Sequence, residues 1–122
     1  MVIGTGIDII EVERVKKAAE KPAFLRTVFT PAEQAYFERF GFEPQTIAGT
    51  FAAKEATAKA LSVGFRGIQW TDIEVLHDEN GKPFANLQNG ALSRLRELAG
   101  KTVHVSISHI KQLAVAQAIV ED

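Results

Sequence analysis

An alanine-rich segment in the middle of the chain most limits the folds open to this sequence. Residues 45–61 follow Pro44, and no glycine or proline occurs between Thr50 and Leu61, so helix propensity is high throughout that stretch. Small side chains recur along it at Ala52, Ala53, Ala56, Ala58 and Ala60. A helix lined in this way can approach another backbone closely. We therefore predict a long helix packed tightly against another element.

The size and composition of the chain favour one globular domain. It has 122 residues, of which 46% are apolar and 24% are charged. Fourteen basic and fifteen acidic residues give a net charge of -1, which argues against a protein that binds nucleic acid through overall charge. The absence of cysteine excludes disulfides, thiolate catalysis and cysteine-based zinc sites.

The apolar beginning of the chain is too short for a membrane span and lacks the basic leader of a signal peptide. Asp8 interrupts it early. We therefore expect a cytoplasmic protein with no membrane partner.

The first structural segment, residues 2–10, has the composition of a β-strand. Its alternation directs Ile7 and Ile9 to one face and Gly6 and Asp8 to the other. Glycine inside a strand usually marks a bulge or a close approach of another backbone.

Helix and strand patterns alternate along the rest of the chain. Thr30, Pro31 and Glu33 form a strong start signal for a helix that runs to about Phe40. Further helices are predicted at residues 11–20, 24–28 and 89–98, and further strands at residues 72–77, 83–87, 102–108 and 113–120. The pattern predicts an α+β fold with an antiparallel sheet packed with helices.

Two acidic residues stand out as candidates for a metal site. Asp8 lies within an apolar strand, where a carboxylate needs a partner, so it either pairs with Arg14 or a backbone group or binds a cation. Glu55 and Lys59 lie one helical turn apart and form either a solvated ion pair or part of a site. If Asp8 and Glu55 converge, they offer oxygen ligands suited to Mg²⁺, and Lys59 suits a transferring phosphoryl group.

Polar residues also share one face of the strand at residues 102–108. His104, Ser106 and Ser108 alternate with apolar residues, so they either face solvent or line a cleft. A Ser–His nucleophile is disfavoured because the spacing along a strand is poor for proton transfer. His77 and His109 lie near strand ends, and we interpret both as surface histidines.

The segment 14–26 is locally basic. It contains five basic residues against the single acid Glu20, and these are Arg14, Lys16, Lys17, Lys21 and Arg26. The segment is either a solvated face or a docking strip for an acidic partner.

Four separated motifs together resemble one enzyme family over nearly the whole chain. They are Gly6-Ile7-Asp8-Ile9-Ile10-Glu11-Val12-Glu13-Arg14, Phe51-Ala52-Ala53-Lys54-Glu55-Ala56 followed by Lys59-Ala60, Asn80-Gly81-Lys82-Pro83, and His104-Val105-Ser106-Ile107-Ser108-His109. In order and spacing they resemble the holo-acyl-carrier-protein synthases, the small bacterial class of 4'-phosphopantetheinyl transferases.

The resemblance implies a reaction and a metal. The phosphopantetheine arm of coenzyme A would pass to a serine of apo acyl carrier protein, releasing adenosine 3',5'-bisphosphate, in support of fatty acid biosynthesis. It assigns Mg²⁺ to Asp8 and Glu55, and stabilisation or protonation of the leaving phosphate to Lys59. The base for the serine proton stays open between Glu55 and a water held by the metal.

The resemblance also implies contacts and an assembly. Lys59, Gly64, Pro83, His104 and Ser106 would contact coenzyme A, in clefts between the subunits of a homotrimer. The carrier protein would dock on Arg14, Lys17, Lys21 and Arg26.

One position departs from the family, and two other functions stay open. Thr50 stands where the family often has arginine, which puts one phosphate contact in doubt. The alternatives are an inactive module that binds the carrier protein and a phosphohydrolase that acts on coenzyme A.

Overall fold

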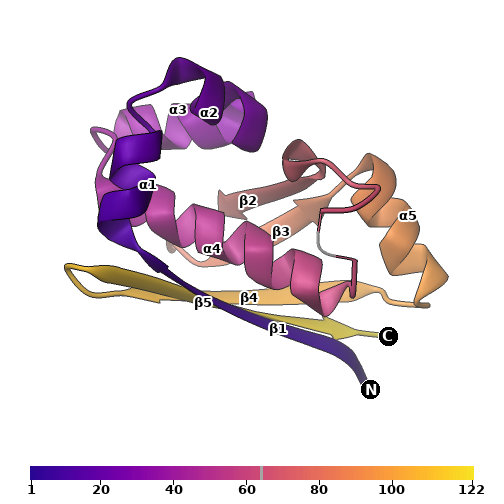
Figure 1. Cartoon of the computed structure of the whole chain (residues 1–122). Helices are drawn as coiled ribbons and strands as arrows, with labels where there is room; N and C mark the ends of the chain where they lie inside the picture. The colour runs from indigo at the N-terminus through magenta and orange to yellow at the C-terminus, as the bar shows by residue number, and fades with distance from the viewer. Residues whose placement is uncertain (64) are drawn as a thin grey trace.

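The computed structural model describes residues 1–63 and 65–122 (Figure 1). Gly64, expected to border coenzyme A, lies outside the described residues. The elements in chain order are β1 (Val2–Glu11), α1 (Val12–Ala18), α2 (Pro22–Val28), α3 (Pro31–Arg39), α4 (Pro44–Ala60), a 3-10 turn η1 (Trp70–Asp72), β2 (Ile73–His77), β3 (Pro83–Leu87), α5 (Asn89–Glu97), β4 (Thr102–His109) and β5 (Leu113–Glu121). The predicted helices and strands are all present, with ends that shift by a few residues.

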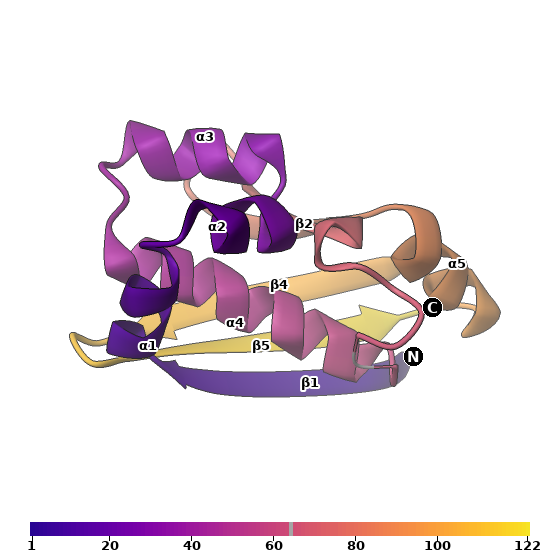
Figure 2. The same cartoon turned by 45° about the horizontal axis from the view of Figure 1, so that its top comes forward.

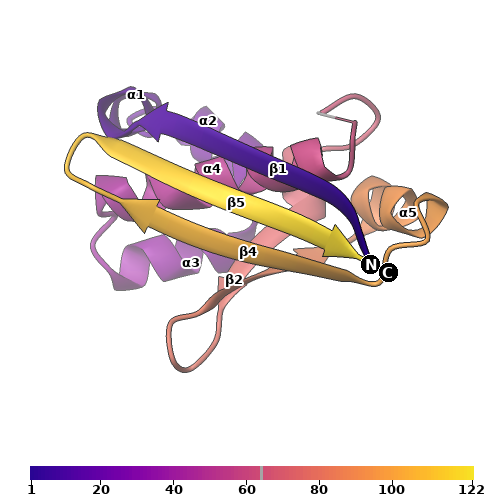
Figure 3. The ribbon, with the colours of Figure 1, turned by 90° about the horizontal axis from the view of Figure 1, so that it is seen from below.

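The main sheet has three antiparallel strands in the order β1-β5-β4. Helix α4 crosses one face of these strands, and α1, α2 and α3 gather at one end of the molecule (Figure 2). The opposite face of the three strands carries no helix (Figure 3). Within the described residues, no helix is long and apolar enough to cross a membrane.

A second sheet differs from the expectation of one antiparallel sheet. Strands β2 and β3 pair only with each other, although β3 contacts β4. The reason is packing: Ile73 and Val75 are buried in the same core as α4, so β2 supplies side chains to that core instead of extending the main sheet.

Close packing of α4 on β1 confirms the prediction from its alanines. Gly4 lies under the carbonyl oxygen of Ala60, and Gly6 lies under that of Ala56. A Cβ atom at either glycine would collide with helix backbone, which cannot move aside as a flexible side chain can. The contact therefore depends on small residues in both elements.

A second core joins the N-terminal helices to α4. It contains Val15, Phe29, Phe37 and Ile47, all nearly inaccessible to solvent. The capping box predicted at Thr30 is present: the Thr30 N–H donates to Glu33 Oε1 at 2.8 Å, and the Glu33 N–H donates to Thr30 Oγ1 at 3.2 Å.

The Glu33 side chain also forms a fully buried ion pair with Lys54. Lys54 Nζ lies 2.7 Å from Glu33 Oε1 and donates to the carbonyl oxygen of Ile73 at 2.6 Å. The second carboxylate oxygen accepts from the Val75 N–H at 2.8 Å. Burial raises the pKa of Glu33 and lowers the pKa of Lys54, so the pair depends on these hydrogen bonds to remain charged. It ties α3, α4 and β2 together.

The glycine contact generates a stability prediction. Gly6→Val should lower the free energy of unfolding by about 3 kcal/mol, because the new side chain overpacks the interface between β1 and α4. The control variant Thr5→Val introduces valine at the neighbouring position, which is exposed. It should change the free energy of unfolding by less than about 0.5 kcal/mol. Urea unfolding of both variants checks this, and equal effects would contradict it.

Candidate active site

Asp8 meets Lys59 where β1 passes under α4. The Asp8 side chain is only 16% exposed, and its Oδ1 lies 3.2 Å from Lys59 Nζ. Lys59 also donates to the carbonyl oxygen of Ile7 at 2.8 Å. Asp8 therefore does have a charged partner, and among the described residues that partner is Lys59 and not Arg14.

Glu55 lies one helical turn before Lys59 and is half-buried. Its pKa is raised first by burial and then by the negative charge of Asp8, while the positive charge of Lys59 opposes the rise. The contribution of Asp8 to this rise indicates that the two carboxylates lie near each other, and a metal ion shared by them stays a prediction.

The donor set at this point fits a magnesium ion. Asp8 and Glu55 provide carboxylate oxygens, and the described residues contain no cluster of three or more histidine, cysteine or acidic side chains that could enclose a cation. Magnesium is commonly held by one or two carboxylates, with waters and substrate phosphates completing its coordination. Two carboxylates alone would leave coordination positions of such an ion to waters and phosphate oxygens.

A polar pocket of about 210 Å³ lies on the other side of α4. Thr50, Pro83, His77, His109 and Tyr36 line it, together with Gln45, Thr46, Gly49, Gly81 and Ile107. It therefore lies between α4, the β2–β3 hairpin and the end of β4. The pocket brings Pro83 together with Thr50, the two positions discussed for nucleotide contacts.

The interpretation of His77 as a plain surface histidine is wrong. Its ring is half-buried and stacks on Tyr36, with ring centroids 4.2 Å apart and an interplanar angle of 5°. Burial lowers the pKa of His77, and the charge of Asp78 opposes this. His109 is exposed, as expected, but it also lines the pocket.

His104 and Ser106 lie on the uncovered face of the main sheet. Both are exposed, and His104 Nε2 lies 2.6 Å from Glu121 Oε1. Ser106 lines a shallow pocket of about 290 Å³ with Ile7 and Gln117. Asp8 faces α4, so within one chain the sheet separates these two residues from the carboxylates. Their contact with coenzyme A stays a prediction.

The predicted docking residues belong to α1, to α2 and to the turn between these two helices. Arg14, Lys17, Lys21 and Arg26 are all exposed. Arg14 also borders an apolar depression of about 150 Å³, whose other lining residues are Ile10, Val15, Ala18, Phe24 and Phe51.

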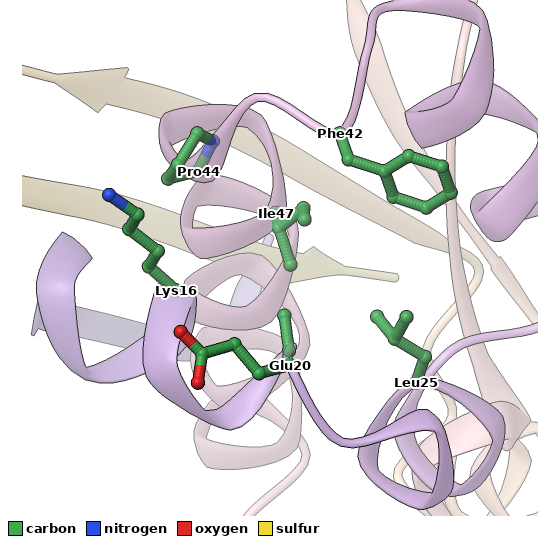
Figure 4. Close-up of a pocket in the computed structure, with 7 residues that line it drawn as sticks. Lys16, Glu20, Leu25, Phe42, Pro44 and Ile47 are labelled. Atoms are coloured by element: carbon green, nitrogen blue, oxygen red, sulfur yellow. The ribbon is translucent and has the colours of Figure 1, made fainter.

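A larger apolar pocket, of about 340 Å³, adjoins the same helices. Figure 4 shows its lining by Lys16, Glu20, Leu25, Phe42, Pro44 and Ile47. No sequence pattern predicted this pocket, which Phe42 lines from the loop between α3 and α4.

Comparisons with known proteins identify the family of this chain. A model of the 4'-phosphopantetheinyl transferase superfamily matches residues 4–118. The holo-[acyl-carrier-protein] synthase of Clostridium tetani is 48% identical over 122 residues, covering 99% of this chain and 97% of the relative. The chain belongs to the holo-acyl-carrier-protein synthase family.

Solved structures of the family share the fold. The holo-[acyl-carrier-protein] synthase from Neisseria meningitidis has a TM-score of 0.91 at 31% identity, with both chains fully covered. The synthase from Bacillus anthracis, solved in complex with CoA (3',5'-ADP), has a TM-score of 0.83 at 35% identity, covering 100% of this chain and 98% of that one.

Tyr36, His77 and His109 are the aromatic residues of the pocket that sequence reasoning did not assign to a site. A signal for His77 was present, since the hairpin places it directly opposite Pro83 in the β2–β3 register. Predicting the hairpin and assigning Pro83 to the nucleotide already implied that His77 lies beside it. No comparable signal placed Tyr36, because its position depends on how α3 packs.

The proximity of the carboxylates predicts a change in titration. In metal-free protein, Asp8→Asn should lower the pKa of Glu55, because removing a neighbouring negative charge favours the ionised carboxylate. Glu13→Gln removes the same charge from an exposed position on α1 and should leave the pKa of Glu55 unchanged. Carboxyl NMR titration measures both variants, and a Glu55 pKa unaffected by Asp8→Asn would contradict the geometry.

Proposed function

We propose that this chain is a holo-acyl-carrier-protein synthase. It transfers 4'-phosphopantetheine from coenzyme A to a serine of apo acyl carrier protein and releases adenosine 3',5'-bisphosphate. The observation that carries the proposal is the meeting of Asp8, Glu55 and Lys59 at the contact between β1 and α4. Membership of the family supports the same activity.

In this proposal Asp8 and Glu55 hold Mg²⁺. When bound, the ion would neutralise charge on the diphosphate of coenzyme A. Lys59 is half exposed and keeps its ammonium group beside Asp8, so it can stabilise or protonate the phosphate that leaves. For the proton of the attacking serine, Glu55 and a water beside the carboxylates remain the two candidates.

The separation of the predicted contacts supports an assembly of subunits. The carboxylates lie beside β1, and the pocket that contains Pro83 lies beside β4, at the opposite edge of the main sheet. His104 and Ser106 lie on its outer face. A coenzyme A that binds between two copies of the chain would bring these separated groups to one ligand.

An apolar outer face gives those copies a surface on which to associate. Ile7 and Ile9 on β1 are 63% and 64% exposed, and Ile110, next to the end of β4, is 61% exposed. Burial of such side chains stabilises an oligomer. We take the assembly to be a homotrimer with active sites between subunits, as the family resemblance implies.

The carrier protein would dock on the basic strip formed by Arg14, Lys17, Lys21 and Arg26. The exposed charges attract an acidic surface, and the apolar depression beside Arg14 can accept an apolar side chain from it. A cytoplasmic location and a role in fatty acid synthesis belong to the same proposal.

The proposed activity predicts a metal-dependent mass gain. Apo acyl carrier protein incubated with the chain, coenzyme A and Mg²⁺ should gain the phosphopantetheine arm, and EDTA should prevent the gain. Asp8→Asn should slow transfer by about a hundredfold or more, because stabilisation by a bound metal is worth several kcal/mol. Mass spectrometry of the carrier protein measures the transfer, and circular dichroism checks that the variant is folded.

Other outcomes of this assay identify the alternative functions. Release of the bisphosphate without carrier protein would indicate a phosphohydrolase. Carrier-protein binding that is unchanged by Asp8→Asn, with no mass gain even for the unmodified chain, would indicate an inactive binding module.

The docking strip predicts a salt-dependent KM. Charge reversal at Arg14 and Lys21 should raise KM for the carrier protein and leave kcat nearly unchanged, because neither residue has a part in the proposed chemistry. Added salt should raise the KM of the unmodified enzyme in the same way. Lys101→Glu reverses an exposed charge at the start of β4 and serves as the control. A KM that does not respond to salt would exclude the strip.

A further inference from the structure

Four aromatic rings form a continuous column that begins at the apolar depression beside Arg14. Phe24 and Phe51 line the depression, with ring centroids 6.1 Å apart. Phe51 stacks on Trp70, with centroids 5.0 Å apart and an interplanar angle of 25°. Trp70 stacks in turn on Phe65, at 3.7 Å and 22°. Of the four rings, Trp70 and Phe65 do not line the depression, so they form a second layer behind it.

Trp70 is held in place through both its backbone and its ring. Its carbonyl oxygen accepts a hydrogen bond at 3.0 Å from the Nζ of Lys54, which is fully buried. The Asp72 carboxylate accepts from the Gln69 N–H at 3.0 Å and so closes the short turn that contains Trp70. Because a hydrogen bond from a charged group is stronger than one between neutral groups, this backbone is a firm anchor. Trp70 can therefore serve as a fixed support for the ring stacked on it.

Phe51 is the ring that needs such a support. It is only partly buried, because it lines the depression on the surface while it rests on Trp70. A stacked aromatic pair is stabilised beyond the area that it buries, so Trp70 favours one orientation of the Phe51 ring. The other walls of the depression include the aliphatic side chains of Ile10 and Val15. The shape of the depression thus depends on the stack behind it.

The charge beside the depression identifies its occupant, given the proposed function on which this step rests. Arg14 lines the depression and belongs to the basic strip, which attracts an acidic carrier protein. An apolar side chain of that protein would meet the Phe51 ring. We propose that Trp70 is a positioning residue for recognition of the carrier protein and that it acts through Phe51, whose ring it holds in the orientation that the carrier protein contacts.

The first test compares two substitutions of Trp70. Trp70→Leu keeps an apolar side chain but removes the flat ring, and Trp70→Phe keeps a ring that can stack. KM for apo acyl carrier protein should rise about fivefold in Trp70→Leu, as the loss of one stacked aromatic pair would produce. KM for coenzyme A and kcat should stay as in the unmodified enzyme. Trp70→Phe should recover most of the affinity for the carrier protein.

A merely structural role would give a different pattern. Leu95→Ala is the matched control, because Leu95 is buried in the other core, on α5, and lines no part of the depression. It should lower stability and leave KM for the carrier protein unchanged. Equal increases in both KM values in Trp70→Leu, or an unchanged KM for the carrier protein, would overturn the inference.

Fluorescence provides a second test that needs only the unmodified chain. Trp70 is its single tryptophan, so the emission reports on the aromatic column directly. A carrier protein that lacks tryptophan should change this emission over the concentrations at which calorimetry shows binding, because an occupant of the depression presses on Phe51. Calorimetric binding with no change in emission would overturn the inference, even where Trp70→Leu does not fold.

Calorimetry also separates this inference from the proposed function, because binding requires neither coenzyme A nor turnover. If Trp70→Leu weakens binding of the carrier protein but the unmodified chain transfers nothing, the transferase proposal fails and the role of Trp70 stands. If the chain transfers the arm and Trp70→Leu binds the carrier protein as tightly as before, the role of Trp70 fails and the transferase stands. If the carrier protein neither binds nor gains the arm, both fail.

Discussion

The contact between the backbones of β1 and α4 determines where the candidate chemistry lies. Gly4 and Gly6 allow the carbonyl groups of Ala60 and Ala56 to rest on the strand, closer than any side chain would permit. At this separation Lys59 reaches a carbonyl oxygen of the strand as well as Asp8. A wider spacing would break both interactions, so the site depends on the absence of side chains at two positions that do no chemistry themselves.

The other side of α4 is fixed by a different kind of interaction. The side chain of Lys54 is buried in the core. Its Nζ forms an ion pair with Glu33 and donates hydrogen bonds to the carbonyl oxygens of Trp70 and Ile73. An unpaired charge at this depth costs several kcal/mol. The buried ion pair therefore fixes the positions of α3 and β2 relative to α4. One helix therefore carries the carboxylate site on one side and positions the wall of the polar pocket on the other.

Local sequence patterns predicted the individual helices and strands well. They predicted less well how these helices and strands pack against one another. The cap at Thr30 and the strand alternation at Ile7 depend on neighbours within a few residues, and both are confirmed. The inward turn of Glu33 and the stack of His77 on Tyr36 depend on helix α3 meeting β2, two segments about forty residues apart. Spacing along the chain carries no information about such a meeting. The assignment of Asp8 and Glu55 to one metal site likewise came from the family resemblance and not from spacing. The pairing of Asp8 with Lys59 became visible only in the folded structure.

The alternation in β1 also shows why a polar residue can face inward. The helix excludes bulky side chains from the covered face, so Gly4, Gly6 and Asp8 occupy it, and Ile7 and Ile9 are left to the outer face. Placing Asp8 under the helix therefore turns positions 7 and 9 to the outer face, where both hold exposed isoleucines. If those side chains are buried between subunits, the geometry that creates the carboxylate site also creates the surface that joins it to the neighbouring chain. Catalytic site and assembly then have a common structural origin in a single strand.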